Sequence, residues 1–350
     1  MKTNEFYIQR CLELARHGLG TTYPNPLVGC VIVHNDKIIG EGWHRKAGEP
    51  HAEVLAIRSV NDQSLLSSST IYVTLEPCSH YGKTPPCSDL IIDKKIPKIV
   101  IGTLDPFAKV AGKGVKKLIA ANRLVTVGVC EEECEELNKR FFTFHRKKRP
   151  YIILKWAETK HGFIAPLAQK SSEIFWITNS KSQQLVHKWR AEEESILVGT
   201  QTALKDNPKL NVRHWQGKNP TRIVIDKSLT LEHSLFLFDS SQPTVVFHDQ
   251  SSESPSSTHS RALNYESIDF SKEIIPQLLS RLHDYDFQSI IVEGGSKTLQ
   301  GFIDLNLWDE ARVFTGQNQI QKGVKAPEFN LKAEKSIDIE GDKLNYYYND

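Results

Sequence analysis

The sequence predicts two consecutive α/β domains, each a layered β-sheet flanked by helices. Strand-like and helix-like stretches alternate through both halves of the chain, which is typical of layered α/β folds. The length of 350 residues is more than a single hydrophobic core usually serves. A basic run closed by a proline, His145–Pro150, separates the halves, so we expect domains over residues 1–145 and 150–350.

The first half is expected to start with a helix and to continue as alternating strands and helices. Apolar residues recur at helical spacing over residues 4–19, and Gly18 and Gly20 end that helix. A proline-fixed loop at Pro24–Pro26 and the turn Asn35-Asp36 then frame a hairpin. The elements expected in order are strands 28–34 and 37–43, helix 51–60, strand 70–75, helix 87–95, strand 98–102, helix 112–121, strand 124–127 and helix 131–144.

The second half shows the same alternation, with β-branched runs leading into helical stretches. We expect strands at 151–157, 195–199, 222–226 and 290–292, a strand ending at Trp176–Thr178, helices at 180–190 and 297–305, and a serine-rich surface loop at 249–260.

Composition narrows the class of protein. The chain is 25% charged and 39% hydrophobic, as ordinary globular proteins are, and its net charge of +2 gives no electrostatic sign of a nucleic-acid or membrane partner. No apolar run approaches the ~18 residues that span a bilayer. The first residues lack the apolar stretch of a secretory signal, so we expect a cytoplasmic protein whose six cysteines are thiols or metal ligands.

The chemistry of the first half centres on one histidine and two cysteines. His51, Cys78 and Cys87 can fill three corners of a zinc tetrahedron, which leaves the fourth for water as in catalytic zinc sites. Glu53 is close by and is not needed as a ligand. A carboxylate beside an activated water is what hydrolytic deamination requires, and Pro77 directly before Cys78 completes the zinc deaminase signature.

Two alternative interpretations of this stretch stay open. The histidine and the cysteines can be ordinary core residues, although their joint occurrence with Glu53 and Pro77 argues against this. Alternatively, His80 can complete a closed, structural zinc site.

The second half carries weaker signals, which suit a phosphorylated ligand. Glu293-Gly294-Gly295-Ser296 joins a strand to a helix and leaves backbone N–H groups at a helix start, and Gly199-Thr200 resembles it. Arg190 and Arg213 are of the type that binds phosphate in bidentate fashion. The chain has no G-x-G-x-x-G fingerprint.

Longer strings of residues carry a family resemblance over nearly the whole chain. In the first half they are Pro24–Cys30, Gly42–His44, His51–Glu53 and Thr74–Cys87; in the second they are Leu154-Lys155, Trp176–Thr178, His187–Ala191, Leu197–Thr200, Asp206–Arg213 and Glu293–Gly295. These strings resemble the bifunctional deaminase/reductase family of riboflavin biosynthesis. The resemblance implies an N-terminal cytidine-deaminase-like α/β/α sheet and a C-terminal dihydrofolate-reductase-like α/β domain.

The resemblance also implies roles for single residues in the deaminase half. His51, Cys78 and Cys87 would hold one Zn²⁺ per chain and Glu53 would move protons. Asn25 and His44 would contact the base of a phosphorylated pyrimidine, and Lys83 its ribose phosphate. The amino group would leave as ammonia.

In the reductase half NADPH would reduce the ribosyl group to ribityl. Lys155 and Glu293 would lie near the reacting carbon. The implied substrate contacts are Arg190, Leu210 and Arg213, and the implied NADPH contacts are Trp176, Thr202, Asp206, Gly295, Ser296, Lys297 and Thr298. Members are usually homo-oligomers, so a dimer or tetramer is expected.

Three positions depart from the family pattern: Phe107 replaces an asparagine, His161 lies in a changed Ser-Leu-Asp-Gly motif, and Gln183 replaces an arginine. Two other functions stay open at this point. The chain can be a deaminase of another nucleotide with an inactive second domain, or a zinc-stabilised binding protein without turnover.

Overall fold

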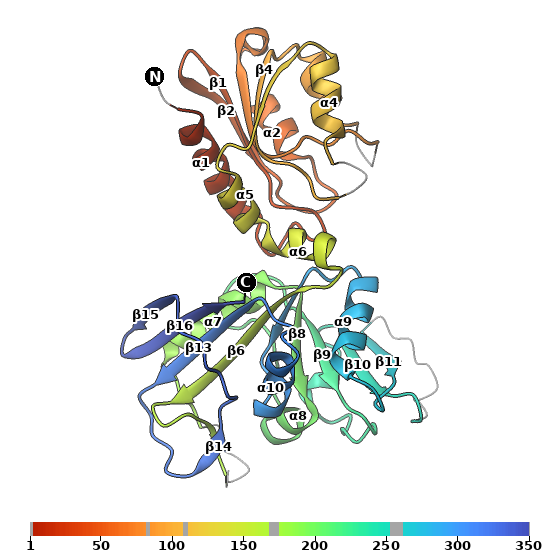
Figure 1. Cartoon of the computed structure of the whole chain (residues 1–350), viewed down its shortest axis with the longest axis vertical. Coiled ribbons are helices and arrows are strands. Elements are labelled where there is room, and N and C mark those ends of the chain that lie inside the picture. The colour runs from red at the N-terminus through yellow and green to blue at the C-terminus, as the bar shows by residue number, and fades with distance from the viewer. Residues whose placement is uncertain (1–2, 82–84, 108–110, 168–174, 253–261, 350) are drawn as a thin grey trace. The chain divides into compact units, whose positions relative to one another are not determined.

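The protein is described by a computed structural model that covers residues 3–81, 85–107, 111–167, 175–252 and 262–349 (Figure 1). It divides into two compact units, Met1–Lys148 and Arg149–Asp350. Within the described ranges, no helix has the length and apolar character needed to cross a membrane.

The first unit is built on a five-stranded sheet in the order β2-β1-β3-β4-β5. The β1–β2 and β1–β3 pairs are antiparallel, whereas β3, β4 and β5 run parallel. The carboxyl ends of β3 and β4 therefore meet at one edge, where open α/β sheets bind ligands. The strands are β1 Gly29–His34, β2 Lys37–Trp43, β3 Thr70–Leu75, β4 Lys98–Thr103 and β5 Leu124–Val127.

Helices cover both faces of this sheet, because its inner strands are apolar on both sides. Alternate residues of β1 separate the two cores: Cys30 and Ile32 pack with α2, and Val31 and Val33 pack with α1. The helices are α1 Asn4–Ala15, α2 Ala52–Ser59, α3 Cys87–Asp93, α4 Lys113–Ala120, α5 Glu131–Leu137 and α6 Lys139–Lys147.

The second unit is built on a nine-stranded sheet in the order β11-β10-β9-β8-β12-β6-β13-β16-β15. The pairs from β11 to β13 are parallel, and β16 and β15 add antiparallel strands at one edge. The strands are β6 Tyr151–Thr159, β8 Ser195–Gly199, β9 Thr221–Ile225, β10 Thr244–Asp249, β11 Leu263–Ile268, β12 Ser289–Val292, β13 Glu310–Gly316, β15 Lys335–Ile339 and β16 Asp342–Tyr348; β7 Phe163–Pro166 pairs with β14 Gly323–Lys325.

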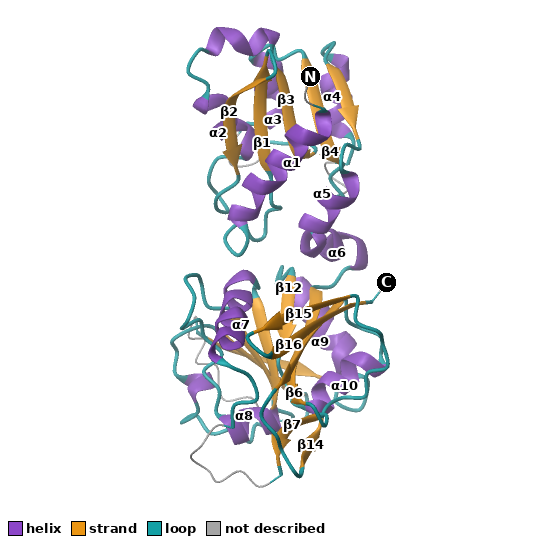
Figure 2. Cartoon of the chain, turned by 90° about the vertical axis from the view of Figure 1, so that its left-hand side faces the viewer, coloured by secondary structure: helices purple, strands orange, loops and turns teal. Residues whose placement is uncertain are grey.

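Helices again lie on both faces of the sheet (Figure 2). α9 Ile274–Asp284 and α10 Ser296–Asp304 pack on one face, and α7 Ser180–Glu192 and α8 Thr200–Asp206 pack on the other. The strands β8 and β12 lie side by side; β8 runs directly into α8, and β12 leads through Glu293-Gly294-Gly295 into α10. Both units are thus layered α/β domains, as the sequence predicts.

Two expectations about single elements are wrong. Residues 131–144 form two helices, because Asn138 turns its amide inward between α5 and α6 instead of continuing the helix. Trp176–Thr178 is not a strand but an irregular segment, with a bend at Thr178, that leads to the Asn179 cap of α7. Part of the predicted loop 249–260 lies outside the described residues, and β10 extends to Asp249.

Asn138 generates the first testable prediction. Its Oδ1 accepts the Leu27 N–H at 2.7 Å and its Nδ2 donates to the Leu27 carbonyl at 2.9 Å, and the side chain is 2% exposed. Asn138→Ala leaves both buried backbone groups unpaired, so we expect the free energy of unfolding of the first unit to fall by about 2 kcal/mol. Chemical denaturation followed by circular dichroism measures this loss.

Glu136→Ala is the control, because it removes an exposed ion pair with Lys139 that contributes well under about 1 kcal/mol. Equal losses for the two variants would contradict the role given to Asn138.

Candidate functional site

The three expected zinc ligands come together in the first unit. His51 Nδ1 lies 3.6 Å from Cys78 Sγ and 3.3 Å from Cys87 Sγ, and all three ligand atoms are within 4.8 Å of one another. Zinc bonds of about 2.0–2.1 Å to nitrogen and 2.3 Å to sulfur give a tetrahedron whose nitrogen–sulfur edges are ~3.5 Å. The donor set and its spacing therefore fit a zinc ion.

Helix starts hold the ligands in these places. His51 is the extended residue that precedes α2, so its side chain leaves the helix path while Glu53 lies in the first turn. Cys87 is the first residue of α3, and its N–H donates to Cys78 Sγ at 3.3 Å. His80 is exposed and is not part of the cluster. The arrangement is thus a site with three protein ligands.

The charges of the cluster suit metal binding. A hydrogen bond from the Cys87 thiol, with help from nearby His51, holds the pKa of Cys78 well below its usual range. The Cys78 sulfur in turn raises the pKa of His51 to about 9. Zinc binds the thiolate form of cysteine, which this environment favours at Cys78.

Glu53 is an unused acid beside this cluster. It is 3% exposed, and burial raises the pKa of its carboxyl. A buried carboxyl group that is not used as a ligand and has a raised pKa is of the kind that serves as a general acid–base catalyst.

Asn25 and His44 lie next to the cluster and are bonded to each other. Asn25 Nδ2 is 3.0 Å from His44 Nε2, and His44 Nδ1 is 3.2 Å from the Pro50 carbonyl. Because a carbonyl oxygen only accepts, the proton of His44 is on Nδ1 and Nε2 accepts from the amide. Burial lowers the pKa of His44, whose ring centre is 5.4 Å from that of His51. Lys83 lies outside the described residues.

A second cluster of charged residues is buried in the second unit. Arg190 on α7 donates from Nε and Nη2 to the Glu293 carboxylate at 2.9 and 2.7 Å, and Lys155 Nζ on β6 is 3.7 Å from the same carboxylate. Burial favours neutral Glu293, but Arg190 and Lys155 hold its pKa down to about 2. Burial lowers the pKa of Lys155.

Glycines at the ends of β8 and β12 form a cradle. A Cβ on Gly199 would lie 2.5 Å from Thr298 Oγ1, and one on Gly295 would lie 3.1 Å from Thr202 Oγ1. Gly295 precedes α10, and no side chain caps that helix start, which also carries Ser296 and Lys297. Two signals that were weak in the sequence thus meet in space, with free N–H groups suited to a phosphate.

The segment Asp206–Arg213 runs from the end of α8 past this cluster and is held from several sides. Arg190 Nη1 donates to the Asn211 carbonyl at 3.3 Å, and the Arg213 N–H donates to His187 Nδ1 at 3.2 Å. Leu210 is almost fully buried, so it contributes to the shape of the segment. Trp176 is half exposed, and its carbonyl accepts from Asn318.

Two buried polar residues near this segment, His187 and Arg222, were not singled out by the sequence pattern. His187 is buried between Arg190 and Arg213, and fully buried Arg222 donates from Nε and Nη2 to the Lys209 carbonyl at 3.1 and 2.8 Å. For His187 the signal is only the family resemblance of the string His187–Ala191. For Arg222 the signal in the sequence is an arginine inside a largely apolar strand.

The structure shows the surroundings of the three residues that depart from the family pattern. The Phe107 ring packs at 5.0 Å from that of His145, where an asparagine would offer a polar group. Gln183 donates to the Thr178 carbonyl at 3.1 Å, so it is used within its own helix start. His161 is exposed in the turn between β6 and β7.

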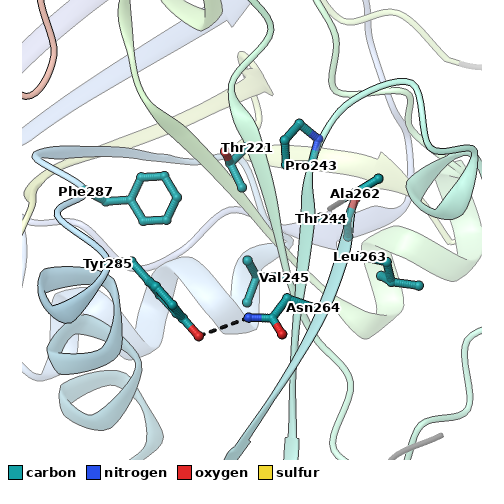
Figure 3. A pocket seen from close by; sticks show the side chains of 9 residues that line it. All are labelled: Thr221, Pro243, Thr244, Val245, Ala262, Leu263, Asn264, Tyr285 and Phe287. Atoms are coloured by element: carbon teal, nitrogen blue, oxygen red, sulfur yellow. Dashed lines mark hydrogen bonds between the residues drawn. The ribbon is translucent and has the colours of Figure 1, made fainter. Parts of the chain in front are cut away.

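A cavity of about 210 Å³ lies elsewhere in the second unit (Figure 3). It is lined at the amino ends of β9, β10 and β11 by Thr221, Thr244 and Leu263, with Tyr285 and Phe287 opposite. Ligands of open α/β sheets bind at the carboxyl ends of the strands, and none of the predicted site residues lines this cavity.

Fold and site together define a class of protein: a zinc-type deaminase unit joined in one chain to a reductase-like unit. Residues 1–103 match the cytidine and deoxycytidylate deaminase zinc-binding region, and residues 150–316 match the RibD C-terminal domain. The chain belongs to the RibD family of riboflavin biosynthesis proteins.

Relatives match over nearly the full length. The riboflavin biosynthesis protein RibD of Aquifex aeolicus is 38% identical, over 97% of this chain and 94% of the relative, and that of Escherichia coli is 35% identical, over 89% and 87%. A solved structure of a diaminohydroxyphosphoribosylaminopyrimidine deaminase/5-amino-6-(5-phosphoribosylamino)uracil reductase from Thermotoga maritima is 36% identical, with a TM-score of 0.88 over 99% of this chain and 98% of that one. Acinetobacter baumannii RibD is 31% identical, with a TM-score of 0.86 over the same shares.

The geometry of the cysteine cluster leads to a prediction about metal content. Cys78→Ser removes one of three ligands, so we expect the purified protein to lose its zinc as measured by mass spectrometry of the metal. Cys130→Ser is the control, because Cys130 lies outside the cluster at the start of α5 and is expected to keep full zinc content. Zinc retained by Cys78→Ser, or lost by both variants, would contradict this assignment.

Proposed function

We propose that the chain carries out two successive reactions of riboflavin biosynthesis, one in each unit. The first unit deaminates a diaminopyrimidinone ribosyl phosphate, and the second reduces its ribosyl group to ribityl. The observation that carries this proposal is the three-ligand cluster of His51, Cys78 and Cys87 beside buried, uncoordinated Glu53. A nucleotide deaminase with an inactive second domain and a zinc-stabilised binding protein are not favoured, because family models match both halves and the relatives are RibD proteins.

In the deaminase unit, His51, Cys78 and Cys87 would hold zinc. Bound zinc supplies the Lewis acidity that makes a water molecule nucleophilic near pH 7. Glu53 takes the proton from that water and returns it to the departing nitrogen, so ammonia leaves and a carbonyl remains. Asn25 and neutral His44 would hold the pyrimidine next to the cluster, and the family resemblance implies Lys83, which lies outside the described residues, as the contact to the ribose phosphate.

In the reductase unit, the glycine cradle and the start of α10 fit the pyrophosphate of NADPH. Thr202, Asp206, Gly295, Ser296, Lys297 and Thr298, together with Trp176, would hold the cofactor. NADPH supplies the hydride for C1′ of the ribose.

The substrate side of this unit is the buried charge cluster. Arg190, Arg213 and the Leu210 segment hold the phosphorylated substrate, and Lys155 with Glu293 faces the reacting carbon. Lys155 has a pKa lowered by burial, so it is suited to give a proton to the ring oxygen as the ribose opens. A cytoplasmic location and a homo-oligomer remain predictions from the sequence and the family.

Glu53→Gln tests the first reaction. The amide keeps the size of the side chain but cannot carry the proton, so we expect ammonia release to fall by about 10²–10⁴-fold. Zinc content and NADPH-dependent reduction of substrate that has already been deaminated are expected to stay normal. Unchanged ammonia release would remove Glu53 from the mechanism.

Glu293→Gln tests the second reaction. It removes the carboxylate shared by buried Lys155 and Arg190, and breaking a buried ion pair in this way costs about 3–5 kcal/mol. We expect NADPH oxidation on deaminated substrate to be lost while ammonia release continues. Loss of both activities in a folded protein would contradict two independent sites.

A further inference from the structure

Glu76, which lies two residues before Cys78, is a buried carboxylate that accepts hydrogen bonds from several backbone N–H groups. It is 4% exposed. Its Oε1 accepts the N–H groups of Gly114 at 2.8 Å and Val115 at 3.2 Å, and its Oε2 accepts that of Gly112 at 2.9 Å, with a longer contact of 3.4 Å from Asp105.

Most of these donors belong to the start of α4, which has no cap of its own. Gly112 precedes the helix with a φ of 72° and makes no side-chain cap. The first N–H groups of a helix need partners, and the positive end of the helix favours a negative charge. Glu76 meets both needs from a different segment, 36 residues earlier than Gly112, and the N–H groups in turn stabilise a carboxylate that is costly to bury unpaired.

The start of α4 also lies in close contact with the peptide that leads to Cys78. A Cβ on Gly114 would lie 2.1 Å from the Pro77 carbonyl oxygen, so only glycine allows this approach. The Glu76 N–H donates to the Thr103 carbonyl at 3.0 Å at the end of β4. The Cys78 carbonyl accepts the Ser88 N–H at 3.1 Å, one residue beyond Cys87. Glu76, Pro77 and Cys78 are therefore fixed from β4, α3 and α4 at once.

We propose that Glu76 is a positioning residue of the deaminase site, which sets the location of Cys78 Sγ by joining it to the start of α4. The proposal rests on the proposed function, since it gives Cys78 the role of a zinc ligand. Glu76 itself does not contact the metal or the substrate. It acts on the metal site through Pro77 and Cys78. Its Oε2 also accepts the N–H groups of Asp105 and Gly112, so both residues are bonded to the same oxygen.

The test compares Glu76→Gln with Glu41→Gln in the full-length zinc protein. The amide oxygen of glutamine still accepts, but its NH₂ group faces N–H donors and cannot. Residues that orient metal ligands typically change metal affinity or activity by about 10–100-fold when replaced. We expect Glu76→Gln to lose zinc to a chelator about 10–100-fold more readily and to lower kcat for ammonia release more than it raises KM.

Glu41→Gln is matched because it also removes a carboxylate that accepts two hydrogen bonds, from Arg10, on the edge strand β2 of the same unit. Its zinc retention and ammonia release are expected to match the wild type. Circular dichroism with chemical denaturation reports whether the first unit is folded in each variant, and NADPH-dependent reduction of deaminated substrate, expected to be normal in both, reports that the second unit is folded.

Gly114→Ala supplies a second arm, because it leaves the chemistry and charge of Glu76 unchanged while its Cβ would press on the Pro77 carbonyl oxygen at 2.1 Å and on Glu76 Oε1 at 3.1 Å. It is expected to weaken zinc retention as Glu76→Gln does, and it decides the matter if Glu76→Gln does not fold. Normal zinc retention and normal kcat in Glu76→Gln, with only a lower midpoint of unfolding, would overturn the proposal. Failure of Glu53→Gln to affect ammonia release would instead count against the proposed function, whereas the difference in zinc retention between Glu76→Gln and the wild type can be measured whatever the substrate is.

Discussion

The first unit depends on one geometric constraint: a nitrogen and two sulfurs from two helix starts and the end of a strand must stay within 4.8 Å of one another. One imidazole nitrogen and two cysteine sulfurs at this spacing are the donor set that zinc takes, so the cluster is best understood as a place for a metal. The parallel strands β3 and β4 end beside it, and α2 and α3 begin there. Glu53 enters the site from the first turn of α2, because His51 itself precedes the helix.

The candidate site of the second unit also lies at the carboxyl ends of parallel strands, but its chemistry is different. Parallel strands β8 and β12 end side by side, and each continues into a helix through glycine. The cradle that results suits phosphate groups. In the adjacent buried cluster, the single Glu293 carboxylate pairs with two basic side chains, Lys155 and Arg190. A hydride transfer needs both features: a fixed cofactor and a group that can supply a proton to the departing oxygen.

Much of this was predictable from the sequence because short strings of residues specify the chemistry. Few arrangements besides a zinc deaminase site place His51, Glu53, Cys78 and Cys87 at that spacing, and Gly294-Gly295 between a strand and a helix indicated a turn with free N–H groups. The predictions failed where a distant partner decides the local structure. The break at Asn138 depends on Leu27, over 100 residues earlier, and the role of Glu76 depends on backbone groups of α4, which no side-chain pattern reveals. Strands β7, β10, β11, β13, β14, β15 and β16 were not predicted. β10 and β13 are buried on both faces, so their sequences lack the period-2 alternation that marks a half-buried strand.

The most direct test of the zinc site is a crystal structure of the zinc-loaded protein with anomalous scattering measured at the zinc edge. We predict a single metal peak bonded to His51 Nδ1 at about 2.0–2.1 Å and to both sulfurs at about 2.3 Å, with a solvent molecule in the fourth place and Glu53 beside it but not bonded. A metal held elsewhere, or a fourth place filled by Glu53, His80 or another side chain, would contradict this arrangement.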